Sequence, residues 1–214
     1  NPPAKVFGLP KVANTLQQAR SGYSSEKEPF EVPLNSNVPS LATMSLAALN
    51  VLSRDPDGFF LMIEGGAVDW AAHGNQTSRA IEEMVDFNSA VAAVIEFVDR
   101  PGDAIDWSNT LLVVTTDHGN GLPLGPDSDT VFFSLPRDNG KGKMPSVRWH
   151  SGSHTNELVP MYARGVGAEW FGELTDGSDS NFRQMYQLDA RWSDQYIDNT
   201  DVFTVCRRVL TESK

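Results

Sequence analysis

Hydrophobic residues along the chain switch between strand-like runs and helix-like spacing. Residues 1–38 are rich in Pro, Ser, Asn and Glu and show weak periodicity, which predicts an irregular lead-in with one short helix near Lys11–Arg20. From Ser40 to Leu52, apolar residues recur three or four positions apart, which predicts a helix. The run Phe59–Ile63 is continuously apolar and of strand length, which is typical of a parallel strand covered by helices on both faces.

A long helix is predicted between Thr77 and Asp99. Its apolar residues form one stripe: Ile81, Met84, Val85, Val91, Val94, Ile95 and Val98. Its acidic residues lie largely off that stripe, on what we expect to be the solvent side: Glu82, Glu83, Asp86 and Glu96.

Further strands and a closing helix follow this long helix. A second buried strand is predicted at 110–116, with shorter strands at 130–135 and 158–163. A closing helix is predicted at 199–210, with Asn199 or Thr200 as its cap. Strands that alternate with helices predict an α/β fold with a mostly parallel sheet.

Charge and composition narrow the classes of function. The chain has 214 residues, of which 28 are acidic and 17 basic, and its formal net charge is −11. This excess argues against a nucleic-acid platform or an anionic membrane surface as partner, because both require basic patches. The single cysteine, Cys206, cannot form an internal disulfide. No apolar run approaches the roughly 20 residues of a membrane span, and no signal-peptide hydrophobic region begins the chain, so we expect a mature chain, a processed piece or a cloned fragment.

Ionisable residues follow two of the predicted strands, at the end where ligands bind to open parallel sheets. Glu64 ends the first strand, and Asp69 and His73 come just beyond it. Asp117 and His118 end the second strand. Asp69 and His73 are four residues apart, so they share one face if this segment is helical.

Two of these side chains, together with a later histidine, match the ligands of a zinc site. His154 lies on the loop before the third strand and could join Asp69 and His73. Two histidines and one carboxylate suit zinc and leave a fourth position open, as in catalytic zinc sites. Glu64 offers only oxygen ligands, which suit magnesium. No cysteine takes part, so a closed structural zinc finger is excluded.

Each of these features also has an ordinary structural explanation. The helical Asp-His pair fits a solvated surface pair, and the Asp-His-Gly at a strand end fits a turn with a capping aspartate. Glu64 fits a loop carboxylate that backbone N–H groups satisfy, and His150 competes with His154 as the loop histidine. Their arrangement at successive strand ends makes a metal site the stronger interpretation.

Several segments, in order along the chain, resemble alkaline phosphatases. The stretch Asp-Gly-Phe-Phe-Leu-Met-Ile-Glu-Gly-Gly at 57–66, followed by Asp-Trp-Ala-Ala-His at 69–73, is similar to their magnesium- and zinc-binding segment. Thr115–Gly119 resembles their second-zinc motif, Ser153–Ala163 their late histidine segment, and Asn199–Phe203 their closing helix. The resemblance, from about Pro39 to Leu210, implies a three-layer sandwich whose metal-binding α/β core would be residues 39–214.

The resemblance also implies two zinc ions and one magnesium ion. The implied ligands are Asp69, His73 and His154 for the first zinc, Asp117 and His118 for the second, and Glu64 for magnesium. The implied reaction is phosphomonoester hydrolysis through a covalent phosphoserine, in which one zinc stabilises the leaving oxygen and the other activates the serine. A homodimer and a periplasmic or secreted location are implied in the same way.

The chain departs from the family pattern in three residues. A nucleophilic serine, a phosphate-clamping arginine and a bridging aspartate lie well upstream in the family. Ser128 and the segment 178–180 do not open an apolar helix as the family's serine does, and we expect Arg79 at the surface of its helix. We therefore expect the C-terminal portion of an alkaline-phosphatase-like domain, inactive by itself. The alternatives are a phosphodiesterase or sulfatase of the same superfamily, or a catalytically inert metal-binding domain.

Overall fold

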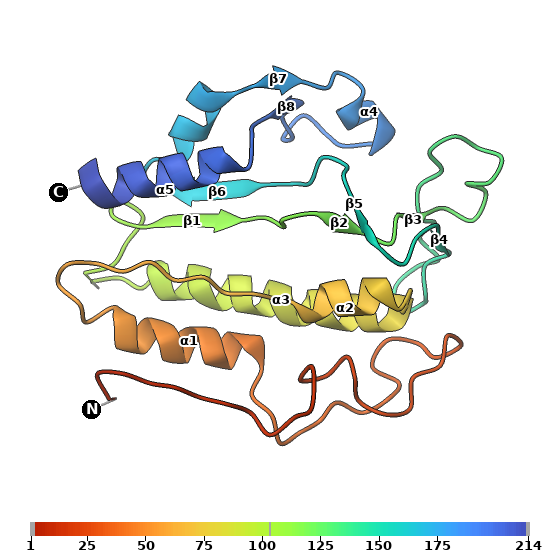
Figure 1. The fold of residues 1–214 in the computed structure, drawn as a ribbon, viewed down its shortest axis with the longest axis horizontal. Helices are drawn as coiled ribbons and strands as arrows, with labels where there is room; N and C mark the ends of the chain where they lie inside the picture. The colour runs from red at the N-terminus through yellow and green to blue at the C-terminus, as the bar shows by residue number, and fades with distance from the viewer. Residues whose placement is uncertain (1–2, 103, 213–214) are drawn as a thin grey trace.

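Helices and short strands lie in successive layers of the computed structural model, which describes residues 3–102 and 104–212 (Figure 1). The helical layer contains three elements: α1 (Leu41–Leu52) and α2 (Ala67–His73) both pack against α3 (Thr77–Val98). Among the helices of the described residues, none has the length and hydropathy needed to cross a membrane.

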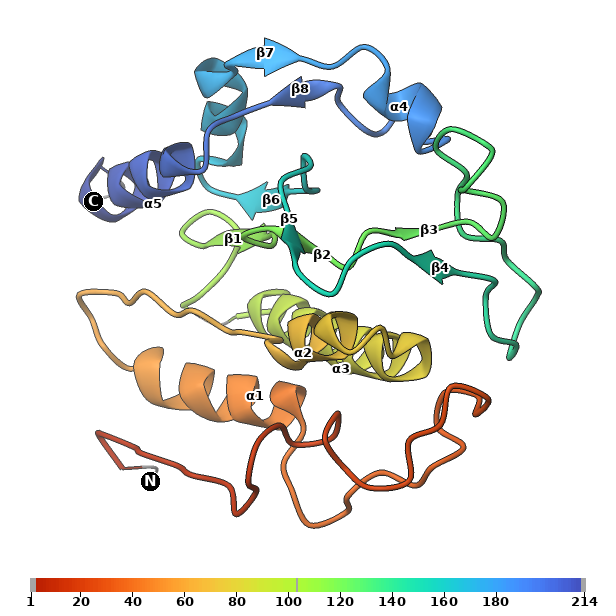
Figure 2. The same ribbon diagram turned by 45° about the vertical axis from the view of Figure 1, so that its right-hand side comes forward.

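The strand layer next to these helices contains β1 (Leu111–Val114) paired with β6 (Tyr162–Gly165) (Figure 2). Beyond it lie the 3₁₀ helix η1 (Ala168–Leu174), α4 (Phe182–Met185) and α5 (Thr200–Glu212). The core lies between the helices and β1, where Leu49 of α1 packs with Val94 and Phe97 of α3 and with Leu112 of β1.

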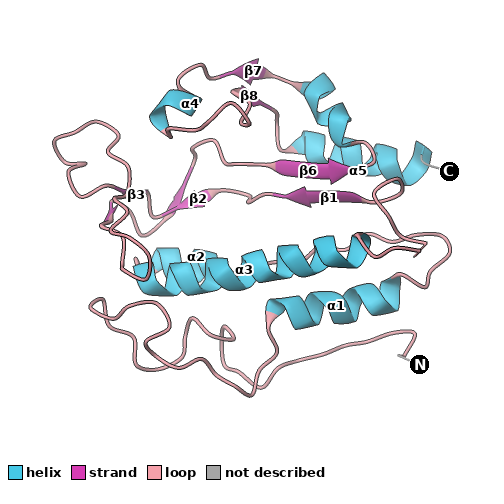
Figure 3. Ribbon diagram, turned by 180° about the vertical axis from the view of Figure 1, so that it is seen from behind, coloured by secondary structure: helices cyan, strands magenta, loops and turns pink. Residues whose placement is uncertain are grey.

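All the strands of the described residues pair antiparallel. Besides β1 with β6, the pairs are β2 (Gly119–Asn120) with β5 (His154–Thr155), β3 (Pro123–Leu124) with β4 (Arg148–Trp149), and β7 (Gly177–Ser178) with β8 (Gln195–Tyr196). The expected mostly parallel central sheet is therefore not found in the described part of the chain. A parallel pair needs a crossover, usually helical, whereas loops and short strands connect β1 to β6 (Figure 3).

The segment Phe59–Ile63 is extended but has no strand partner among the described residues. Phe59, Leu61 and Ile63 pack against the core, whereas Phe60 and Met62 are 67% and 76% exposed. The expectation of burial on both faces was therefore wrong. The alternation of exposure along the segment shows that the described core covers only one of its faces.

Local signals predicted the helices well and the minor elements poorly. The Ser40 hydroxyl caps α1 by accepting a hydrogen bond from the N–H of Thr43 at 3.1 Å. At the start of α5, Asp198 Oδ1 accepts a hydrogen bond from the N–H of Thr200 at 2.9 Å, and Asn199 directly precedes the first helical residue. Two weaker predictions were wrong, because turns and bends replace the helix at 11–20 and the strand at 130–135. The strand expected at 158–163 is present but lies later in the chain, at Tyr162–Gly165.

The N-terminal part of the acidic side of α3 is buried, contrary to the expectation of a solvent-facing side, whereas Glu96 is exposed as expected. Arg79, Glu82 and Glu83 are all buried, because the irregular lead-in covers them. Arg20 of the lead-in forms an ion pair with Glu82 at 2.7 Å and donates to the carbonyl groups of Gln17, Val32 and Pro33. Charged side chains therefore hold the lead-in on the helix.

The two buried glutamates of α3 differ in pKa. Burial acts to raise the pKa of Glu82, but hydrogen bonds from the N–H of Phe30 and from Arg20 and Arg79 outweigh it, and the pKa lies below its usual value. Burial and the negative charge of Asp86 raise the pKa of Glu83 to about 7. The carboxyl group of Glu83 in the folded chain therefore changes its charge near neutral pH.

Candidate metal centre

Helix α2 carries the first two candidate ligands. The turn at Gly65 and Gly66 precedes the helix, Asp69 lies in its first turn and His73 is its last residue. The two side chains lie one turn apart on the same face, and His73 Nε2 is 3.3 Å from Asp69 Oδ2. The helix on which this pair depended in the sequence is therefore present.

The short ladder between β2 and β5 brings His154 to the same place. In this ladder Gly119 is opposite Thr155 and Asn120 is opposite His154. Gly121 follows β2 and fixes the loop before β5, because its N–H donates to the Ser153 carbonyl and its own carbonyl accepts from two N–H groups of that loop. Gly121 has φ +76°, and a Cβ there would lie 2.5 Å from the Trp149 ring, so only glycine fits without strain.

Asp69, His73 and His154 form a triangle of possible ligand atoms. His73 Nε2 lies 3.1 Å from His154 Nε2, and His154 Nε2 lies 3.4 Å from Asp69 Oδ1. Ligands about 2.0–2.1 Å from a tetrahedral zinc ion are separated from one another by roughly 3.3 Å. The three side chains are therefore spaced as one zinc ion requires, with His73 nearest Oδ2 and His154 nearest Oδ1 of the same carboxylate.

The tautomer of His73 also suits zinc binding. Its Nδ1 lies 2.8 Å from the carbonyl oxygen of Gly152. Because a carbonyl only accepts, Nδ1 carries the proton and Nε2 presents its lone pair to the centre of the triangle. A hydrogen bond of this kind from the second ring nitrogen is the usual support of a metal-binding histidine.

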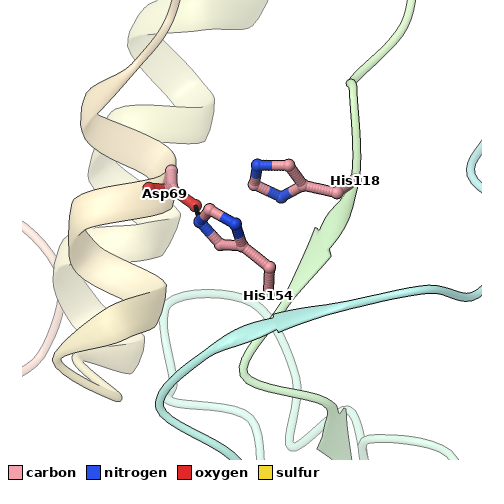
Figure 4. Close-up of side chains that lie close together, drawn as sticks. All are labelled: Asp69, His118 and His154. Carbon is pink, nitrogen blue, oxygen red and sulfur yellow. Dashed lines mark ion pairs between the residues drawn. The ribbon is translucent and has the colours of Figure 1, made fainter.

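His118 lies against this triangle. Its ring stacks on that of His154 with 3.6 Å between centroids, and possible ligand atoms of Asp69, His118 and His154 all lie within 4.8 Å of one another (Figure 4). His118 Nε2 is 3.3 Å from Asp117 Oδ2, although the Asp117 side chain is 85% exposed. The structure therefore brings together Asp69, His73, His118 and His154, whereas Asp117 lies close only to its neighbour His118.

Glu64, the sixth predicted ligand, lies apart from that group. It is exposed at the end of the extended segment, where it lines a shallow depression with Leu41, Met44 and Met62. Its role as a magnesium ligand remains a prediction. His150, the competing loop histidine, instead forms a hydrogen bond of 2.7 Å with Ser128 Oγ.

Asn120 is a further polar residue of the site for which the sequence predicted no role. Its side-chain amide donates to Asp69 Oδ1 at 2.6 Å. One signal was present in the sequence: Asn120 is two positions after His118, so in extended backbone the two residues point to the same side.

The chain is similar in sequence to several bacterial alkaline phosphatases. The chain is 38% identical to alkaline phosphatase 3 of Bacillus subtilis (strain 168), over 71% of this chain and 44% of that protein. It is 30% identical to the alkaline phosphatase of Escherichia coli (strain K12), over 68% of this chain and 31% of that protein. The chain thus spans less than half the length of these relatives.

Solved structures and a family model extend this comparison. The crystal structure of a cold-active alkaline phosphatase from the psychrophile Shewanella sp. matches with a TM-score of 0.52 at 20% identity, over 72% of this chain and 52% of that one, which supports an alkaline-phosphatase-like fold. The alkaline phosphatase family model matches residues 14–145, which is more than half of the chain and includes every predicted ligand except His154. The chain belongs to the alkaline phosphatase family.

Proposed function

We propose that this chain supplies most of the metal ligands of an enzyme that hydrolyses phosphate monoesters by the alkaline phosphatase reaction. The observation that carries the proposal is the triangle of Asp69, His73 and His154, whose separations of 3.1–3.4 Å suit one zinc ion. Asp117 and His118 would hold the second zinc ion, and Glu64 would hold magnesium. Family membership supports the reaction class.

The residues of this chain would hold and orient the metal ions. Zinc and magnesium, when bound, would stabilise negative charge on the phosphate and leaving oxygens and activate the attacking group. Asp69 contributes negative charge, and the Gly152 carbonyl keeps the His73 ring turned so that Nε2 faces the site. The serine that forms the covalent phosphoserine and the arginine that binds phosphate would belong to the rest of the protein.

Metal ions would also reverse the local charge of an acidic protein. With a formal net charge of −11, the chain by itself repels phosphate esters. Two zinc ions and one magnesium ion would place positive charge where the substrate binds, because bound cations are often the largest local charges in a site. In the intact protein we further propose a homodimer and a periplasmic or secreted location, both on the basis of family membership.

Zinc binding provides the first test. At a free zinc concentration 100-fold above Kd, binding stabilises a protein by about 2.7 kcal/mol. For a chain of this size that corresponds to a rise in Tm of roughly 5–10 °C. We expect His154→Ala to remove this rise and the matched variant His150→Ala to keep it, because His150 is engaged by Ser128. Absence of any shift in the unaltered chain would contradict the metal site.

Activity provides the second test. The chain alone should bind zinc yet barely hydrolyse a nitrophenyl phosphate ester, because it lacks the proposed nucleophile. Turnover at an ordinary enzymatic rate that a chelator abolishes would contradict this division of roles. In the intact protein, monoester turnover should exceed diester turnover; the reverse would favour a phosphodiesterase.

A further inference from the structure

We propose that Asn120 is a positioning residue, which orients the Asp69 carboxylate for the metal ion. This inference rests on the metal site of the proposed function. Asn120 belongs to β2, whereas Asp69 belongs to α2, so the contact crosses from the strand to the helix. Its Nδ2 lies 2.6 Å from Asp69 Oδ1 and 3.4 Å from the backbone carbonyl oxygen of Asp69.

The hydrogen bond fixes the rotation of the carboxylate. With Oδ1 held by the amide, Oδ2 lies 3.3 Å from His73 Nε2. On the other side Asn120 is directly opposite His154 in the β2–β5 ladder. Asn120 therefore binds Asp69 through its side chain and lies opposite His154 in the strand pair. This double placement fixes the carboxylate relative to both histidines.

An amide suits this position electrostatically. A lysine or arginine at the same place would also donate to Asp69, but its charge would repel a metal cation a few ångströms away. The neutral amide donates a hydrogen bond and leaves the full negative charge of Asp69 available to the ion. Hydrogen bonds to metal-binding carboxylates are a usual part of metal sites, and their loss typically costs 10–100-fold in affinity.

The other half of the Asn120 amide indicates that stability alone does not explain the residue. Its Oδ1 is buried and has no hydrogen-bond partner among the described residues. A buried acceptor without a partner lowers the stability of the folded state. A leucine of similar size would remove that unpaired oxygen together with the hydrogen bond to Asp69. Because these two changes have opposite effects on the metal-free folded state, its stability should change little, whereas the orientation of Asp69 should be lost.

The test compares Asn120→Leu with Thr155→Val. Thr155 lies on the partner strand, and its hydroxyl is also buried without a partner among the described residues, so Thr155→Val is matched in place and burial but leaves Asp69 untouched. Zinc affinity is measured by competition with a chromophoric chelator, and the ligand geometry is followed by the visible absorption of bound Co²⁺. We expect Asn120→Leu to weaken zinc 10–100-fold and change the Co²⁺ spectrum, with no fall in the metal-free Tm. Thr155→Val should keep zinc affinity within twofold.

Several outcomes would overturn the proposal. If Asn120→Leu binds zinc as the unaltered chain does, Asn120 does not position Asp69, although the metal site itself stands. If its metal-free Tm falls together with its affinity, the residue is structural. If Thr155→Val weakens zinc equally, the effect belongs to the β2–β5 ladder rather than to the amide. If the unaltered chain does not bind zinc, both this proposal and the proposed function fail.

Discussion

Replacing Glu83 by glutamine should stabilise the chain at alkaline pH. Glu83 is buried in α3 beneath the lead-in, and its Oε1 has no hydrogen-bond partner among the described residues. The charged groups acting on it are Asp86 and Glu82, which raise its pKa, and Arg20, which lowers it. Glutamine has nearly the same shape as the protonated glutamic acid but cannot ionise.

The size and sign of the effect follow from the pKa. Burial first, and then Asp86, raise the pKa of Glu83 from 4.5 to about 7 in the folded state. Between these values the unfolded chain releases a proton that the folded chain retains, so stability falls as pH rises and the loss is complete above pH 7. Since one pKa unit corresponds to about 1.4 kcal/mol, the full loss is about 3 kcal/mol.

Urea unfolding of metal-free protein at pH 5 and pH 8.5 measures this difference. The free energy of unfolding of Glu83→Gln relative to the unaltered chain should increase by roughly 2–3 kcal/mol between the two pH values. Glu96→Gln is the control, because Glu96 is an exposed acid on the same helix and should show no such pH dependence. A difference that is equal at both pH values would refute the reasoning.

Two further substitutions test the core and the loop beside the metal centre. Leu49→Ala removes a buried side chain between α1 and α3 and should lower the free energy of unfolding by about 2–5 kcal/mol in urea; a loss below 1 kcal/mol would mean that the two helices do not share a core. Gly121→Ala forces a side chain into a backbone with φ +76° against the Trp149 ring, so the free energy of unfolding should fall by about 1–3 kcal/mol and zinc affinity should also decrease. Unchanged zinc affinity would show that this loop does not position His154.

The predictable parts of the molecule were those set by neighbours in sequence. Ser40 and the spacing after it defined α1, and the four-residue separation of Asp69 and His73 placed both on one helical face. The apolar run at Phe59–Ile63, predicted as a strand, is not part of any strand pair among the described residues. Its partners and its covering depend on distant segments, and the composition of the run carries no information about them.

The unpredicted parts depend on long-range contacts. Glu82 and Glu83 have the composition of a solvent-facing side, but the distant lead-in buries them, with Arg20 and the N–H of Phe30 bound to Glu82. The hydrogen bond from Asn120 to Asp69 joins residues 51 positions apart, so the spacing of Asn120 from His118 indicates a shared side of the strand but not this partner. In the same way, Met84 and Val85 belong to the apolar stripe and are nevertheless exposed, because α1 and α2 pack on other sides of α3.

The open side of the segment Phe59–Ile63 determines how the chain behaves at high concentration. Its extended backbone has no strand partner among the described residues, and Phe60 and Met62 project from it into solvent. An unpaired extended edge with exposed apolar side chains is a template on which a second molecule can add a strand. The formal net charge of −11 opposes such contacts by mutual repulsion, and salt screens that repulsion. The colloidal stability of the chain is therefore greatest at low ionic strength and decreases as the pH approaches the isoelectric point near 4.7.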